Sequence, residues 1–99
     1  MGWSNGGGTR SALQMQQLSQ QMAHVLTGSQ WRAARGLFDL TERAGGPFRV
    51  SPDDTYWIVE AFRAAAAHPE MPAGWAEFAR EVADKGTDAL RAGQPWRWR

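Results

Sequence analysis

The sequence predicts a mainly α-helical protein: one compact four-helix domain with extended ends. These ends either pack on the domain or contribute to a minor sheet of two or three strands from residues 2–4, 48–50 and 95–98. Three observations predict this fold class. A chain of 99 residues has the size of a single domain. Apolar side chains recur at helical spacing in four separate segments, and glycine or proline follows each segment, as is typical of helix ends.

The first two predicted helices account for residues 10–27 and 30–44. Thr9 is the predicted N-cap of the first, and Gly28 occupies a position that favours a helix end. The apolar side chains of the first helix fall on one face: Met15, Leu18, Met22, Val25 and Leu26. The second helix has an apolar half and a charged half, and the Gly-Gly-Pro run at 45–47 prevents its continuation.

A short strand and a strongly capped helix follow. Residues 48–50 alternate apolar and polar side chains, which predicts an edge strand. Ser51 is a capping residue, Pro52 suits the first helical turn, and two aspartates follow at the positive end of the helix dipole. The third predicted helix therefore begins here and runs to about Ala67.

The fourth predicted helix opens at Met71-Pro72 and runs to about Ala92. Gly86 lies on its apolar stripe, where glycine costs about 1 kcal/mol of helix propensity relative to alanine. We therefore expect another helix to approach this glycine closely. The final Trp-Arg-Trp-Arg, residues 96–99, alternates with the period of a strand, and Gly2-Trp3-Ser4 is a candidate pairing partner.

The chain thus divides into three parts. Residues 1–9 are expected to be a flexible or extended segment, residues 10–93 the helical domain, and residues 94–99 an extended tail packed on it. The first residues lack the apolar core of a secretory signal. Residues 11–31, the longest stretch without Asp, Glu, Lys or Arg, are too polar to span a bilayer. We expect a soluble cytoplasmic protein without a membrane partner.

Composition and spacing exclude most chemistry. Without cysteine the chain has no disulfide, thiol nucleophile or zinc–thiolate site. His24 and His68 lack the spacing of metal ligands, so we expect neither a metal nor another cofactor. Helix capping explains Asp53 and Asp54, and no acid, base and nucleophile occur at a usable spacing. The sequence therefore predicts a protein that is not an enzyme and has no catalytic residue.

Six tryptophans are many for 99 residues, and one of them lies off the predicted core face. Trp57 is roughly opposite Phe62 on the third helix, with Ala61 and Ala64 at i+4 and i+7. Either this helix is central and packed on two sides, or it shows an apolar patch to a partner. The leading hypothesis is a small accessory or regulatory module that binds another protein, or itself, through Trp57, Ala61 and Ala64.

The glutamine-rich first helix is a second candidate surface. Gln17 and Gln21 carry no charge, so docking on them avoids the cost of desolvating charges. The competing interpretation is an ordinary solvated helix face.

Nucleic-acid binding is the alternative function. Residues 1–50 carry a formal charge of +3 and residues 51–99 one of −2. Arginines would contact phosphates while the tail tryptophans stack on bases. The candidate arginines are Arg32, Arg35, Arg43, Arg97 and Arg99. A net charge of +1 is low for a domain that depends on phosphate contacts, which favours a protein partner.

Four segments of the chain resemble a group of short, uncharacterised actinobacterial proteins with a Gly-Trp start and a Gly-Gln-Pro-Trp-x-Trp end. The segments are Met1–Asn5, Phe48–Pro52, Met71–Arg80 and Ala92–Trp98. The resemblance implies a cytoplasmic accessory protein, encoded by the genome or a phage of a GC-rich bacterium, and it carries over no catalytic residue. It also implies that Trp3, Trp96 and Trp98 contact the folded body.

Overall fold

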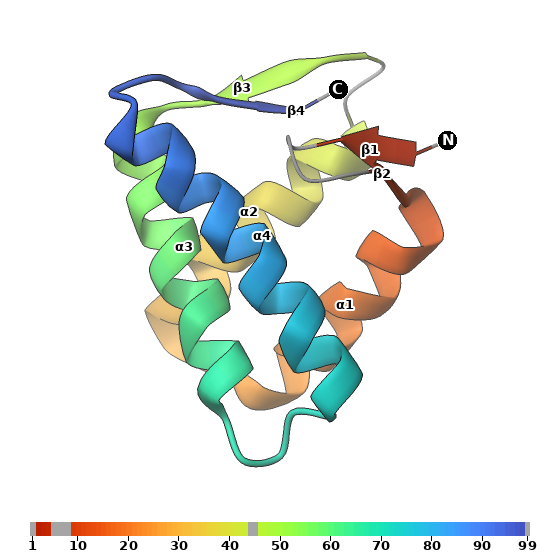
Figure 1. Cartoon of the computed structure of the whole chain (residues 1–99). Coiled ribbons are helices and arrows are strands. Elements are labelled where there is room, and N and C mark those ends of the chain that lie inside the picture. Colours follow the sequence, from red (N-terminus) through yellow and green to blue (C-terminus); the bar gives the residue numbers. More distant parts are fainter. Residues whose placement is uncertain (1, 5–8, 44–45, 99) are drawn as a thin grey trace.

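The computed structural model describes residues 2–4, 9–43 and 46–98, and the side chains of residues 13–43 and 46–98. The described chain folds into four helices and four short strands (Figure 1). The helices are α1 (Ala12–Val25), α2 (Gly28–Arg43), α3 (Pro52–Ala67) and α4 (Ala73–Arg91). The strands are β1 (Gly2–Ser4), β2 (Thr9–Ser11), β3 (Phe48–Val50) and β4 (Trp96–Trp98). The predicted mainly α, four-helix architecture is confirmed.

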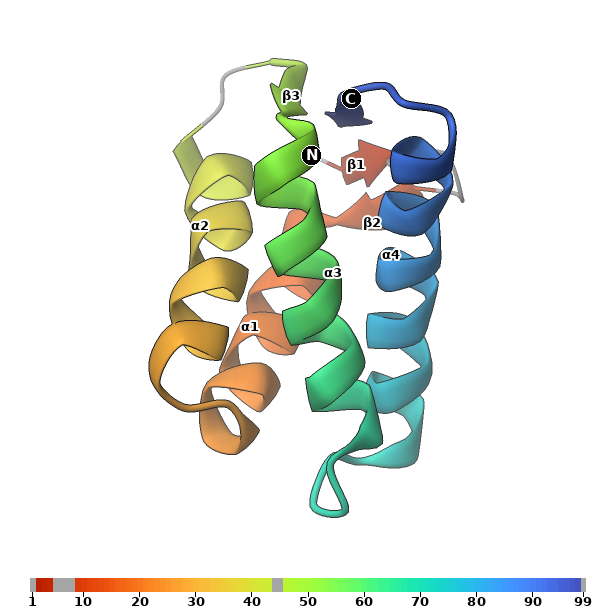
Figure 2. The ribbon, with the colours of Figure 1, turned by 90° about the vertical axis from the view of Figure 1, so that its left-hand side faces the viewer.

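The four helices form a bundle in which α3 lies between α2 and α4 (Figure 2). Helix α1 lies behind these helices in this view. Both pairs of strands lie at one end of this bundle, close to the two chain ends (Figure 1). None of the helices formed by the described residues combines the length and the apolar character that crossing a bilayer requires.

The strands form two antiparallel pairs. β3 pairs with β4, with Phe48 opposite Trp98 and Val50 opposite Trp96. β1 pairs with β2. The expectation that residues 2–4 join the sheet of 48–50 and 95–98 is therefore wrong. Strands β1 and β2 are close in sequence, so pairing them costs less chain entropy than pairing β1 with the other end of the chain.

The N-terminal pairing also shifts the first helix. Residues 9–11 form β2, so the predicted N-cap Thr9 lies in a strand and α1 begins at Ala12. Helix α1 ends at Val25, and Gly28, with a φ of 56°, opens α2 two residues earlier than expected. Glycine adopts this left-handed conformation without steric cost, which allows one helix to follow another almost directly. The expected flexibility of residues 5–8 lies outside the described residues.

The start of α3 has the predicted capping arrangement. The Asp54 backbone N–H donates to Ser51 Oγ at 3.2 Å, and Pro52 occupies the first turn. A second hydrogen bond stabilises the same turn, in which the Thr55 hydroxyl donates to the Ser51 carbonyl oxygen at 2.8 Å. This junction fixes the direction in which α3 leaves β3, and therefore which side of α3 faces solvent.

The apolar stripes of the helices meet in one core, and β4 adds two large rings to it. Trp96 and Trp98 are 2% and 1% exposed. Gly86 of α4 is the point of closest approach: an added Cβ would lie 2.5 Å from Val59 Cγ2 and 3.3 Å from the Trp96 ring. The close helix contact expected at Gly86 is confirmed, with α3 as the neighbour.

Candidate functional site

Two adjacent aromatic side chains of α3 point to solvent. Trp57 is 62% exposed and Tyr56 is 47% exposed. Their ring centroids are 5.0 Å apart with an interplanar angle of 82°, an edge-to-face pair. Such pairs have a preferred geometry, so each ring restrains the other. We name Tyr56 and Trp57 the aromatic pair.

The position of α3 in the bundle explains why the aromatic pair is exposed. Helices α2 and α4 flank α3 on both sides (Figure 2). Most of the surface of α3 is therefore buried. The buried residues are Thr55, Ile58, Val59, Ala61, Phe62, Ala65 and Ala66. Only a narrow outer strip remains, so α3 is a central helix and also shows aromatic rings to solvent.

The predicted Trp57–Ala61–Ala64 patch does not form as such. Ala61 is 1% exposed and belongs to the core, so its assignment to an accessible surface is wrong. Ala64 is half-buried and packs against the core. One step of i+4 advances a helix by about 400°, which turns Ala61 away from Trp57 by roughly 40°. On a helix with two neighbours, that rotation is enough to bury a small side chain.

Carboxylates surround the aromatic pair. Asp53 and Asp54 precede it by one turn and Glu60 follows it by one turn, and all three are exposed. None of them forms an ion pair with a basic side chain of the described residues. The N-terminal half of the strip therefore combines the aromatic pair with three carboxylates, and Arg63, which pairs with Asp84, follows Glu60 by one turn.

The glutamine surface of α1 is only partly accessible. Gln17 is exposed and Gln21 is half-buried. Leu13, 61% exposed, lies in the same i, i+4, i+8 row. This row contains no aromatic side chain and no charge.

The five predicted nucleic-acid-binding arginines fall into separate parts of the structure. Arg32, Arg35 and Arg43 are exposed on α2, where Asp39 forms ion pairs with both Arg35 at 3.8 Å and Arg43 at 3.7 Å. Arg97 is exposed on β4, and Arg99 lies outside the described residues. Asp39 offsets part of the positive charge of α2, which weakens the case for a continuous phosphate-binding face.

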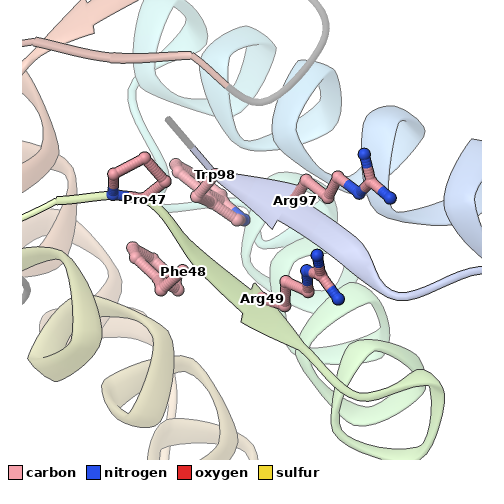
Figure 3. Close-up of a pocket in the computed structure, with 5 residues that line it drawn as sticks. All are labelled: Pro47, Phe48, Arg49, Arg97 and Trp98. Carbon is pink, nitrogen blue, oxygen red and sulfur yellow. The ribbon is translucent and has the colours of Figure 1, made fainter.

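The structure instead places Arg97 directly opposite Arg49 in the β3–β4 pair. The two line a depression of about 290 Å³ together with Pro47, Phe48 and Trp98 (Figure 3). The sequence predicts strands at 48–50 and 95–98, but not the register that places Arg49 opposite Arg97. The alternation of arginine with apolar residues in both segments was the available signal.

No three histidine, cysteine or acidic side chains of the described residues are placed to hold a metal ion. A second depression, of about 430 Å³, is lined by Gly74, Trp75, Glu77, Phe78 and Glu81 on α4. It contains two carboxylates and no nucleophile.

Comparison with known proteins gives one match. The model of a family described as "Domain of unknown function (DUF7739)" matches residues 3–99. No curated protein and no solved structure matches the chain. Because the family model spans both terminal segments and all four helices, the chain belongs to the DUF7739 family.

Proposed function

We propose that this protein is a non-enzymatic interaction module that binds a basic segment of another protein through the aromatic pair. The exposure of Trp57 and Tyr56 on the outer strip of α3 carries this proposal. Neither ring is needed for the core, which α3 builds with its other faces.

The aromatic pair has the properties of an interaction hot spot. Tyrosine and tryptophan are enriched among the residues that dominate binding energies, because they bury a large area and lose little side-chain entropy. Covering roughly 100–150 Å² of these rings at about 25 cal/mol per Å² contributes about 2.5–4 kcal/mol before the costs of association. The pair is also held on a helix, so docking requires little reordering of the backbone.

The carboxylates around the pair select the partner. Asp53, Asp54 and Glu60 form an acidic rim that favours lysine or arginine side chains and disfavours acidic ones. Rim charges act mainly on the association rate, so binding should become slower as salt is raised. The expected partner is a protein segment with an apolar anchor flanked by basic residues.

Site-specific photo-crosslinking in the source cells tests the proposal. A photoreactive amino acid replaces Trp57 in one variant and Leu13 in another, because the two side chains are equally exposed on different helices. We expect a protein adduct at position 57 that carries basic residues at the crosslinked segment, and none at position 13.

Three outcomes would contradict the proposal. No adduct at position 57 would remove the aromatic pair as a binding surface. Equal adducts at both positions would show non-specific contact or favour the glutamine row of α1. An adduct to a second copy of the chain would replace the foreign partner with self-association.

A further inference from the structure

The β3–β4 ribbon has two different faces. Trp96 and Trp98 point into the core and Val50 is buried with them, so the backbone of both strands is anchored. Arg49 and Arg97 occupy the intervening positions and are exposed. Figure 3 shows the two side chains next to each other on neighbouring strands, with both guanidinium groups extending in the same direction.

This arrangement brings together two like charges. The residues stand opposite each other in the antiparallel register, where like charges are destabilising. Neither guanidinium forms an ion pair with a carboxylate of the described residues, whereas Arg35, Arg43 and Arg63 each do. The repulsion between Arg49 and Arg97 is therefore not relieved by the described part of the chain.

We propose that Arg49 and Arg97 together bind the phosphate group of a small phosphomonoester. Guanidinium groups present planar forks of N–H donors that match phosphate oxygens, and two of them match the charge of a dianion. A bound dianion would also remove the like-charge repulsion across the two strands. The site lies on a different part of the molecule from the aromatic pair and does not depend on the proposed protein partner.

The surroundings of the arginines favour a small organic phosphate. The depression of about 290 Å³ has room for one phosphate and a compact organic group. Its other walls are Pro47, Phe48 and Trp98, with the Phe48 and Trp98 rings stacked at 6.0 Å and only 5° from parallel. Because Trp98 is only 1% exposed, Pro47 and the half-buried Phe48 are the walls that would contact the organic part while the guanidinium groups hold the phosphate.

A nucleic-acid backbone fits the same observations less well. It presents singly charged phosphates in a row and needs several cations along its path. The nearest candidate set, on α2, shares its charge with Asp39. A nucleic acid is therefore kept as an outcome of the test.

The test is an NMR titration of the full-length chain with phenyl phosphate and, separately, inorganic phosphate, at constant ionic strength. We expect saturable amide shifts confined to residues 48–50 and 96–98, with tighter binding of phenyl phosphate. Arg49→Gln and Arg97→Gln should each weaken binding at least tenfold. Arg32→Gln, which removes an exposed arginine of α2, should leave it unchanged, as should Trp57→Gln.

Each remaining outcome would overturn the proposal. Shifts that do not saturate, or that sulfate reproduces with equal affinity, would reveal only general anion screening. Equal weakening by Arg32→Gln, together with tighter binding of a single-stranded oligonucleotide than of phenyl phosphate, would identify a nucleic-acid face instead. The amide spectra of the free variants show whether each is folded, so a loss of binding is not mistaken for a loss of structure.

Discussion

Gly86 of α4 lies so close to Val59 of α3 that a Cβ at position 86 would be 2.5 Å from Val59 Cγ2. The same glycine leaves room for the Trp96 ring, which would be 3.3 Å from that Cβ. The absence of a side chain at position 86 thus allows both α3 and the Trp96 ring of β4 to pack closely against α4. Both proposed surfaces depend on it, because α3 carries Trp57 and β4 carries Arg97.

Gly86→Ala should destabilise the protein even though alanine is the better helix former. The gain in helix propensity is about 1 kcal/mol, but a methyl group forced into this contact costs typically about 1–3 kcal/mol. Val59 cannot easily swing aside, because a β-branched side chain in a helix has one favoured rotamer. We expect a net loss of up to about 2 kcal/mol in denaturant unfolding.

Gly36→Ala is the matched control for this prediction. Gly36 lies inside α2, is exposed, and has nothing within 4 Å of an added Cβ. This variant should gain about 0.5–1 kcal/mol of stability. If Gly86→Ala stabilised the protein as much as Gly36→Ala does, the close α3–α4 contact would be wrong.

Arg97→Glu should stabilise the fold. It converts the like-charged cross-strand pair with Arg49 into an opposite-charged one, which is worth about 0.2–1 kcal/mol. The gain should shrink as salt is raised, since both side chains are exposed. Thermal unfolding at low and high salt measures it, with Arg32→Glu as the exposed control. A lower melting temperature for Arg97→Glu at low salt would contradict the geometry of the pair.

Removal of residues 95–99 should greatly weaken the fold. The deletion takes away Trp96 and Trp98, two of the largest fully buried side chains, and leaves β3 unpaired. Losing one buried tryptophan costs about 3–5 kcal/mol, a large share of the stability of a small domain. Circular dichroism during thermal unfolding would show a much lower transition or none. An unchanged melting temperature would mean that the tail is not part of the core.

Replacing a buried tryptophan should destabilise the protein more than replacing an exposed one. Trp57→Gln should change the free energy of unfolding by no more than about 0.5 kcal/mol, because the ring is largely exposed. Trp96→Phe should cost more, since it leaves space in the core. The same replacement removes Trp96 Nε1, which is buried without a hydrogen-bond partner among the described residues. Removing an unpaired buried polar group is favourable and offsets part of the cost. Denaturant titrations of both variants make the comparison.

Local signals made some elements predictable. The start of α3 follows from Ser51 and Pro52, whose capping geometry depends only on neighbouring residues. The close contact at Gly86 followed from a glycine on an apolar stripe, which is unfavourable unless a neighbour approaches. In the tail, the Trp-Arg alternation predicted the extended β4 strand.

Features that depend on distant partners were not predictable in the same way. Residues 2–4 had two possible partners, and sequence periodicity does not distinguish β2 from β4. Ala61 is compatible with either a core or a surface position, so its burial depends on how closely α2 and α4 flank α3. The opposition of Arg49 and Arg97 is set by strand register between segments far apart in the chain.

Binding of a basic protein segment by the aromatic pair is tested most directly by affinity. The affinity of the crosslinked partner is measured for the wild-type chain, Trp57→Gln and Leu13→Gln. A hot-spot residue contributes about 2 kcal/mol or more, so Trp57→Gln should raise Kd about 30-fold or more. Leu13→Gln should leave Kd unchanged. Equal affinities of the wild-type chain and a folded Trp57→Gln variant would contradict the account.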